Sequence, residues 1–209
     1  MLTFGPKLLS QGHLIQHVRY SSHMTSIVAN SDLTLRAAVD ADAQNIAAIF
    51  AHYVTSTTVT FELEPPTVQD WRDKVRESQS VGWPFVVGMV GGQVVGYAYV
   101  GPWRLKPAYR HTVEDSVYLA PGHTGRGYGR GLLAELLARA TGAGARQVIA
   151  VIADTGHPAS VRLHQRAGFE QAGLLRQVGF KHGRWIDTLL LQRDLTAEPA
   201  GPRSPRAAS

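Results

Sequence analysis

The residues best suited to chemistry lie in one segment of the chain, residues 114–131. An alternating stretch ends at Leu119, and after a short loop glycines occupy every second position: Gly125, Gly127, Gly129 and Gly131. They open a Leu-rich helix, and a helix N-terminus presents unpaired N–H groups and about half a positive charge. Glycine lets a phosphate approach the backbone without a Cβ in the way. The segment predicts an anion site, to which Arg126 and Arg130 could add charge-assisted contacts.

The glycine pattern by itself does not identify the anion. The dinucleotide pattern G-x-G-x-x-G fails, because Arg130 and Leu132 occupy the positions where its third glycine would fall. The phosphate-loop pattern, G-x-x-x-x-G-K followed by Ser or Thr, is also absent from the sequence. A glycine-rich turn that merely enters an amphipathic helix is the alternative interpretation.

Glu114 lies just before this segment, in a strand predicted over residues 112–119. Side chains alternate between the two faces of a strand. Val113 and Asp115 therefore share one face with the following aliphatic residues, while Glu114 and Tyr118 share the other. Glu114 need not point where the aliphatic side chains point.

Composition limits the remaining possibilities. A chain of 209 residues suits one well-buried core, and the absence of cysteine excludes a thiol nucleophile, a disulfide and a thiolate metal site. The nine histidines form no H-E-x-x-H motif, so we expect no metal. The net charge of +5 comes from scattered basic residues, so we expect no nucleic-acid partner. No apolar run reaches the roughly 18 residues of a membrane span, and a cytoplasmic protein without membrane contact is expected.

Hydrophobic periodicity predicts a mixed α/β domain over residues 33–195. Residues 1–32 are interpreted as a disordered or misassigned extension, and residues 196–209 as a disordered tail. Strands are predicted over residues 33–38, 85–90, 94–100, 112–119, 147–153 and 185–191. Helices are predicted after a cap at Asp40, after a capping box at Thr67, and over residues 129–140 and 160–167. The strand, helix and strand over 112–153 imply a parallel strand pair, and Trp71, Trp83 and Trp185 are expected in the core.

These residues resemble the GCN5-related N-acetyltransferase superfamily. The pyrophosphate loop of that superfamily has the sequence pattern Q/R-x-x-G-x-G/A, where x is any residue. Residues 124–129 match that loop except at Thr124. Within the superfamily, the phosphinothricin and methionine sulfoximine N-acetyltransferases are most similar. The segments that carry this resemblance are residues 56–61, 101–104, 108–109, 112–119, 160–164 and 179–187. The resemblance implies a mixed central sheet flanked by helices, with a splayed central parallel strand pair.

For the cofactor, the resemblance implies that acetyl-CoA binds at the end of the strand predicted over residues 112–119 and at the glycine loop. The strand backbone would pair with the pantetheine arm, and the loop would hold the pyrophosphate. The implied contacts are Val117, Tyr118, Leu119, Thr124, Gly125, Arg126, Gly127, Tyr128, Gly129 and His157. His157 stands where many relatives have an asparagine.

For catalysis, the resemblance assigns Glu114 as the base that deprotonates the acceptor amine, directly or through water. A carboxylate with a pKa near 4.3 is a poor base toward an ammonium unless its surroundings raise that pKa. His164 could protonate the departing thiolate and Tyr118 is a rival donor, although a helical histidine is more often packed in the core. Attack on the thioester is direct and needs no covalent enzyme intermediate.

For the acceptor, the resemblance places the substrate in a loop containing Lys106, Tyr109 and Arg110, with Phe61 and Trp103 as pocket walls. A cation there would bind the carboxylate of an amino acid. Lys181 and Arg184 compete for that role, across a homodimer interface of the kind that relatives suggest.

The sequence therefore predicts transfer of acetyl from acetyl-CoA to the amine of a small amino-acid analogue. Two alternatives stay open: an acetyltransferase for another amine, such as a protein N-terminus or an aminoglycoside, and an acyl-CoA-binding sensor without turnover.

Overall fold

The computed structural model describes residues 32–156 and 158–196. The strands are β1 (Thr34–Ala37), β2 (Phe85–Val90), β3 (Gln93–Pro102), β4 (Thr112–Leu119), β5 (Gln147–Ala153), β6 (Glu170–Lys181) and β7 (Arg184–Asp194). The helices are α1 (Ala43–Ser56), α2 (Val68–Ser80), α3 (Tyr128–Gly142) and α4 (Ala159–Arg166), with 3-10 turns at Asp40–Asp42 and Pro107–Tyr109.

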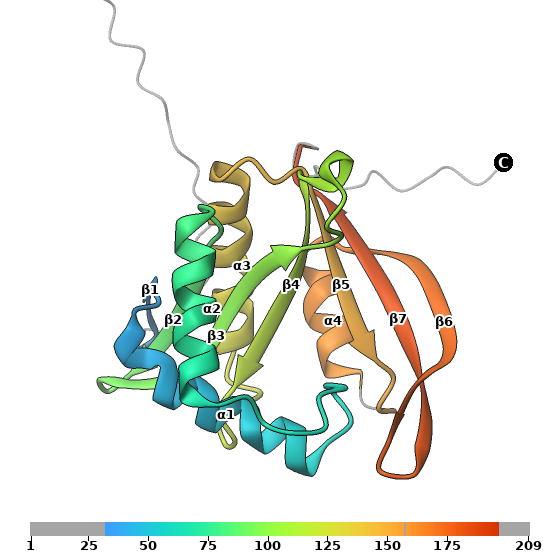
Figure 1. The fold of residues 1–209 in the computed structure, drawn as a ribbon, viewed down its shortest axis with the longest axis horizontal. Coiled ribbons are helices and arrows are strands. Elements are labelled where there is room, and N and C mark those ends of the chain that lie inside the picture. Colours follow the sequence, from blue (N-terminus) through green and yellow to red (C-terminus); the bar gives the residue numbers. More distant parts are fainter. Residues whose placement is uncertain (1–31, 157, 197–209) are drawn as a thin grey trace, which may run out of the picture.

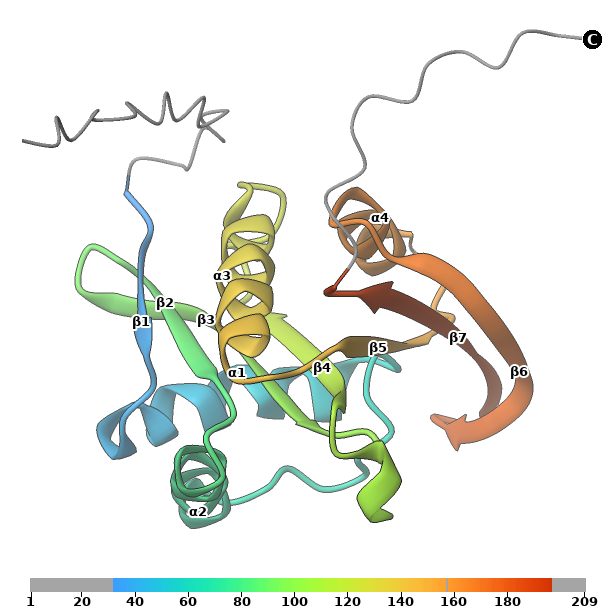
Figure 2. The same cartoon turned by 90° about the horizontal axis from the view of Figure 1, so that it is seen from above.

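The strands form one mixed sheet in the order β1-β2-β3-β4-β5-β7-β6. Within the described residues, β4 and β5 are the parallel pair, and each other neighbouring pair is antiparallel. Helices α3 and α4 cover one face of the sheet and α1 and α2 cover the other (Figure 2). The predicted fold class, with its parallel pair at the centre of a mixed sheet, is confirmed (Figure 1).

Each face of the sheet has its own hydrophobic cluster. The apolar stripe of α3 predicted from the sequence is buried in one cluster: Leu132, Leu133, Leu136, Leu137 and Ala140. The other cluster lies beneath α1 and α2 and contains Ile46, Phe50, Trp71 and Tyr97. A strand between the two layers can therefore present chemistry on either side.

Local signals explain where two helices begin. The capping box at Thr67 is confirmed, since the Thr67 hydroxyl accepts from the Asp70 N–H at 3.1 Å and the Thr67 N–H donates to Asp70 at 2.7 Å. The predicted cap at Asp40 is wrong. Asp40 opens a 3-10 turn, and α1 begins at Ala43 after Asp42, whose carboxylate pairs with Arg36 at 2.6 Å.

The sequence pattern misses β6 and misplaces one tryptophan. The pairing of β6 with β7 shifts register twice, and Gln177 has a positive φ of 50°, so β6 lacks the steady alternation that predicts a strand. Trp71 is buried as expected, and Trp83 is partly buried. Trp185 is not core but 63% exposed, because the next residue, Ile186, faces inward at 2% exposure.

Some predictions concern residues that lie outside the described part of the chain: the extension before residue 32, the tail after residue 196, and His157. Among the described residues, no helix is both long and apolar enough to span a membrane.

Candidate functional site

The centre of the sheet contains a gap between two strands that start as partners. The parallel register of β4 and β5 runs from Thr112 opposite Gln147 to Asp115 opposite Ala150 and then ends. Beyond that point β4 stays paired with β3 and β5 stays paired with β7. The two strands visibly diverge toward their C-terminal ends (Figure 1). The β4–β5 gap is the space between residues 116–119 and residues 151–153.

Backbone direction determines which groups of β4 face this gap. The Thr112 carbonyl accepts from Trp103 at 3.2 Å, and the Ala120 N–H donates to Val95 at 2.8 Å, so even-numbered residues bond toward β3. Odd-numbered residues between them direct their backbone groups toward β5, because these groups alternate along a strand.

Beyond Asp115, the odd-numbered residues of β4 are Val117 and Leu119. The Tyr53 hydroxyl donates to the Leu119 carbonyl at 2.6 Å. The N–H groups of both residues and the Val117 carbonyl are therefore directed at the β4–β5 gap. The backbone of Tyr118 is directed at β3, and only its side chain belongs to the site.

The glycine loop leads from this gap into α3. Gly125 and Gly127 have φ angles of 75° and 84°, a left-handed conformation that L side chains rarely adopt, and a Cβ at either would meet nothing within 4 Å. Gly127 is the N-cap of α3. The first N–H groups of the helix have no intrahelical acceptor and point out of its end. Thr124 and Arg126 are exposed beside them, whereas Tyr128 is buried and donates to Asp32 at 3.0 Å. The glycine loop therefore leads into an open helix N-terminus, the geometry on which the expected anion site depends.

Glu114 lines a cavity of about 380 Å³ on the α1 and α2 side of β4. The walls come from five elements: β4 gives Glu114, Ser116 and Tyr118, β3 gives Tyr99, α1 gives Phe50, α2 gives Asp70, Trp71 and Lys74, and the α1–α2 loop gives Thr60, Glu62 and Pro66. The predicted separation of faces on β4 is confirmed, since Val113, Val117 and Leu119 pack in the opposite cluster.

The environment of Glu114 favours a basic carboxylate. Burial raises the pKa of Glu114 above its usual value, and the negative charge of Asp115 raises it further. The positive charges of Arg104 and Lys74 oppose that rise without cancelling it. A carboxylate with a raised pKa accepts a proton more readily, which is the property a general base requires.

Lys74 is a site residue that the sequence pattern does not single out. Its ammonium donates to the Tyr99 hydroxyl at 2.9 Å and lies 4.3 Å from the centre of the Tyr99 ring. Lys74 follows Trp71 by three residues, so the two share a helix face. That spacing, together with the half-buried pattern of α2, is the signal that could have indicated a cation beside the core.

On the opposite face of β4, Asp115 and His164 form a buried pair. His164 is 4% exposed, and its Nε2 lies 2.9 Å from Oδ2 of Asp115. The other ring nitrogen, Nδ1, lies 2.8 Å from the Ser160 carbonyl oxygen. A carbonyl can only accept, so Nδ1 carries a hydrogen. Nε2 and the carboxyl group must then share one further proton, since two acceptors cannot bond each other.

The direction in which the pKa of His164 is shifted agrees with this shared proton. Burial opposes a charged ring, but the hydrogen bond and negative charge of Asp115 outweigh it, so the pKa of His164 is raised. Asp115 breaks the run of aliphatic side chains on its face of β4. A lone carboxylate among buried residues signals a buried partner, but the partner itself, 49 residues away, is not predictable from spacing.

Tyr118 lies at the back of the Glu114 cavity. Its ring packs against Phe50 and Tyr53, with centroids 5.1 and 5.2 Å away. Burial raises the pKa of the phenol well above its usual value, although a hydrogen bond with the Thr60 side chain works against the rise. Tyr118 therefore keeps its proton and serves as a hydrogen-bond donor more readily than as an acid.

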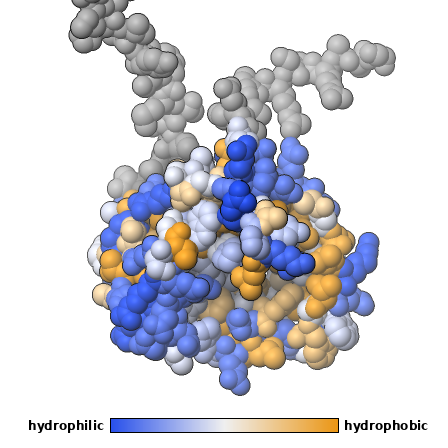
Figure 3. Space-filling model, turned by 45° about the horizontal axis from the view of Figure 1, so that its top comes forward, coloured by the Kyte–Doolittle hydropathy of each residue, from blue (hydrophilic) through white to orange (hydrophobic). Residues whose placement is uncertain are grey.

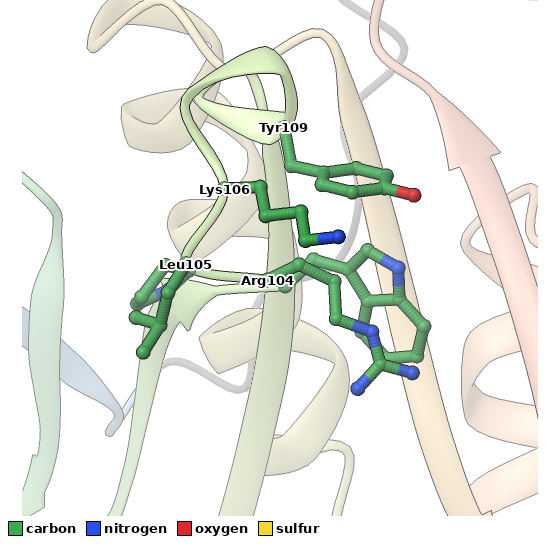
Figure 4. Close-up of a pocket in the computed structure, with 6 residues that line it drawn as sticks. Arg104, Leu105, Lys106 and Tyr109 are labelled. Carbon is green, nitrogen blue, oxygen red and sulfur yellow. The ribbon is translucent and has the colours of Figure 1, made fainter.

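The loop between β3 and β4 surrounds a second, more open hollow of about 550 Å³. Trp103, Lys106 and Tyr109 line it, and Arg104 stacks on Trp103 at 4.5 Å. Arg104, Lys106 and Tyr109 point to one side of the loop and Leu105 to the other (Figure 4). Arg110 is exposed at the end of the same loop.

The family of the chain follows from comparison with known proteins. Residues 46–169 match the family model described as the acetyltransferase (GNAT) family. This chain belongs to the GNAT acetyltransferase family. Among the described residues of this acetyltransferase, no group of three or more His, Asp or Glu side chains could hold a metal ion.

Individual relatives show which acetyltransferases of the family this chain is similar to. The acetyltransferase is 46% identical over 170 residues to phosphinothricin N-acetyltransferase of Alcaligenes faecalis, covering 81% of this chain and 86% of the relative. It is 36% identical to the L-methionine sulfoximine/L-methionine sulfone acetyltransferase of Salmonella typhimurium, covering 80% and 98%. A solved GNAT phosphinothricin acetyltransferase of Sinorhizobium meliloti, in complex with acetyl-CoA, has 42% identity and a TM-score of 0.76, covering 83% and 96%.

The structure brings together only part of the predicted acceptor site of the acetyltransferase. Glu114 and Tyr118 share one cavity, whereas Trp103, Lys106 and Tyr109 line the more open hollow. Phe61 is 39% exposed on the α1–α2 loop. Lys181, one of the competing cations, is buried and donates to the Thr60 carbonyl at 2.8 Å.

Proposed function

We propose that this acetyltransferase transfers acetyl from acetyl-CoA to the α-amine of a small amino-acid analogue of the phosphinothricin or methionine sulfoximine type. The observation that carries the proposal is the divergence of β4 and β5 after Asp115, which lies beside both the Glu114 cavity and the glycine loop. The relatives that act on these two substrates, at 46% and 36% identity, support the choice of acceptor.

The residues of the gap and loop fit acetyl-CoA. The backbone groups of Val117 and Leu119 can pair with an extended amide chain as a further strand would. The positive-φ glycines Gly125 and Gly127 leave room for a pyrophosphate at the N-terminus of α3. We include Thr124, Arg126, Tyr128 and Gly129 in this contact through their backbone, and we retain His157 as a proposed contact. When bound there, acetyl-CoA supplies the acetyl group as a thioester.

Glu114 receives the proton of the acceptor ammonium, directly or through a water molecule. Its raised pKa makes it a better base than an exposed glutamate, and its place in the cavity wall puts it on the acceptor side of β4. General base catalysis by one positioned side chain typically contributes about 10²–10⁴-fold. The freed amine then attacks the thioester directly, and the Val117 N–H faces the gap where an oxyanion would form.

The proton for the departing thiolate comes from one of two groups. His164 shares a proton with Asp115 beside the last paired residues of β4 and β5, which places a stored proton near the gap. Tyr118 lies on the opposite face of β4, and its raised pKa makes it a weaker acid. We favour His164, with Tyr118 as a donor that orients the reacting groups.

The anionic group of the acceptor binds the cation in the wall of the Glu114 cavity. Lys74 lines the same cavity as Glu114, so a zwitterionic amino acid can place its ammonium at Glu114 and its acid group at Lys74. Trp103, Lys106 and Tyr109 line the separate hollow of the β3–β4 loop, Arg110 is exposed at the end of that loop, and Phe61 lies on the α1–α2 loop. A substrate chain that extends beyond the cavity would meet these residues.

We also propose a homodimer formed through β6 and β7. Large apolar side chains are exposed on these two strands: Leu174, Leu175, Val178, Phe180 and Trp185. Hydrophobic residues gather on the side of the molecule where β6 lies in Figure 1 (Figure 3). Contiguous exposed apolar surface marks interaction sites. Light scattering that gives a monomer mass at micromolar concentration would refute the dimer.

The experiment that tests the proposed function is a thiol-release assay with acetyl-CoA against amino-acid analogues, amino sugars and peptides. We expect release with phosphinothricin and methionine sulfoximine at a kcat/KM well above that for the other classes. Release with peptides alone would refute the acceptor, and no release with any acceptor would refute turnover in favour of a sensor.

A further inference from the structure

The α1–α2 loop, residues 57–67, is held at one end by a strand more than a hundred residues away in the sequence. Lys181 at the end of β6 is 3% exposed, and its ammonium donates to the Thr60 carbonyl oxygen at 2.8 Å. The loop passes beside the tip of the β6–β7 hairpin in both views of the ribbon (Figures 1 and 2). A buried ammonium that is committed to a backbone carbonyl is suited to fixing the position of that backbone.

A second contact holds the same loop, at a position where the partner residue is a glycine and has no side chain. The Phe61 ring lies directly on the backbone of Gly179. A Cβ atom at Gly179 would lie 2.7 Å from Cε1 of Phe61 and closer still to two other ring carbons. Gly179 does not have a positive φ, so glycine is not required there by backbone conformation. A side chain at Gly179 would instead displace the Phe61 ring from its present position.

The irregular pairing of β6 produces this arrangement. The register with β7 shifts between Leu175 and Gly179, and Gln177 has a positive φ there, with its N–H donating to Asp187 at 2.8 Å. A bulge of this kind re-aims the side chains that follow it. After it, Gly179 and Lys181 are buried while Phe180 between them is exposed. The two buried positions therefore share the face that meets the loop.

The loop that is held in this way forms part of the acceptor cavity. Thr60 and Glu62, on either side of Phe61, line the same cavity as Glu114. The Thr60 side chain is also close enough to Tyr118 of β4 to work against the rise of its pKa. A displacement of Phe61 or of the Thr60 carbonyl would move one wall of the cavity relative to Glu114.

We propose that Gly179 and Lys181 are positioning residues for the acceptor: they fix the α1–α2 loop and thereby the part of the cavity wall that Thr60 and Glu62 form. The inference rests on the proposed function for the identity of the cavity. In this inference the Lys181 ammonium hydrogen-bonds the protein backbone and does not bind the substrate carboxylate. Neither residue touches the reacting atoms.

Gly179→Ala is the main test, with Gly173→Ala as its matched control. Gly173 lies on the same strand without a positive φ, and a Cβ there would meet Leu190 at an ordinary 3.9 Å. We expect Gly179→Ala to raise the acceptor KM about tenfold or more, because a misplacement of about 1 Å can cost up to 10²-fold. The KM for acetyl-CoA should stay unchanged. Phe61→Ala removes the ring that clashes, so adding Gly179→Ala to it should cost nothing further.

Hydrogen exchange of residues 57–66 tests the contact without any turnover. Exchange should accelerate in Gly179→Ala and in Lys181→Met, which keeps the aliphatic stem and removes the donor, but not in Gly173→Ala. Unchanged exchange in both test variants would overturn the proposal, as would a KM for acetyl-CoA that rises in parallel with that of the acceptor. If the wild-type protein acetylates no acceptor, the exchange data still decide the loop contact, so failure of the proposed function is distinguishable.

Discussion

Replacement of Asp115 by Asn and by Ala should separate two roles of the buried pair. In Asp115→Asn the side-chain amide can donate to Nε2 of a neutral His164, whose Nδ1–H stays on the Ser160 carbonyl. The geometry is kept and the shared proton is lost. In Asp115→Ala the Nε2 atom is left without its partner in a site where His164 is 4% exposed.

The expected magnitudes follow from the burial of the pair. Removing one partner of a buried pair costs about 3–5 kcal/mol, whereas a substitution that preserves the hydrogen bond costs about 1 kcal/mol or less. For a domain of this size each kcal/mol shifts Tm by about 2–4 °C, so Asp115→Ala should lower Tm by about 6–20 °C. Differential scanning calorimetry measures both variants directly.

The pH dependence of the unfolding free energy gives the sharper test, because its sign reverses between the wild type and Asp115→Asn. The folded pKa of His164 is raised above its unfolded value near 6.5, so its stabilising contribution is complete below that value and is lost as pH rises through the folded pKa. In Asp115→Asn, burial favours the neutral ring, so the contribution is instead lost as pH falls below about 6.5. A difference in unfolding free energy between wild type and Asn variant that stays constant from pH 5 to 9 would refute the shared proton.

Three further substitutions test the rest of the site. Glu114→Gln should lower kcat by about 10²–10⁴-fold with CoA affinity unchanged, and the rise of kcat/KM with pH that Glu114 gives the wild type should flatten; steady-state kinetics and calorimetric titration with CoA measure these effects. Gly127→Ala should weaken CoA binding, since a side chain at a φ of 84° costs about 1–2 kcal/mol, whereas Gly144→Ala, with a φ of 92° at the far end of α3, should cost stability but leave the CoA Kd unchanged. Lys74→Met should raise KM about tenfold or more for an amino acid and much less for its carboxamide, since a hydrogen bond to a charged group is worth about 1.5–3 kcal/mol; equal effects on the two acceptors would refute carboxylate binding by Lys74.

Local patterns predict the parts of the site that depend on short-range physics. Alternation along β4 correctly separates Glu114 from the face of Asp115, and the spacing of glycines correctly predicts an open helix N-terminus at Gly127. The capping box at Thr67 follows from hydrogen bonds between residues three apart. Each of these features needs no information from distant segments.

Features that depend on distant partners are not predicted. The partner of Asp115 lies on α4, and the contact of Lys181 with Thr60 joins segments 121 residues apart. Asp40 resembles a helix cap, but the pairing of Asp42 with Arg36 on β1 moves the start of α1 to Ala43. The bulged strand β6 gains its structure from pairing with β7, and local propensity does not indicate it.

We propose that acetyl transfer takes place in the β4–β5 gap, with the acceptor on the Glu114 side of β4. A crystal structure with acetyl-CoA and a slowly reacting acceptor analogue tests this most directly. We predict backbone hydrogen bonds from Val117 and Leu119 to the pantetheine arm, the pyrophosphate at Gly125 and Gly127, and the acceptor nitrogen within reach of the Glu114 carboxylate. Acetyl-CoA bound away from the gap, or an acceptor on the face of Asp115 and His164, would contradict the account.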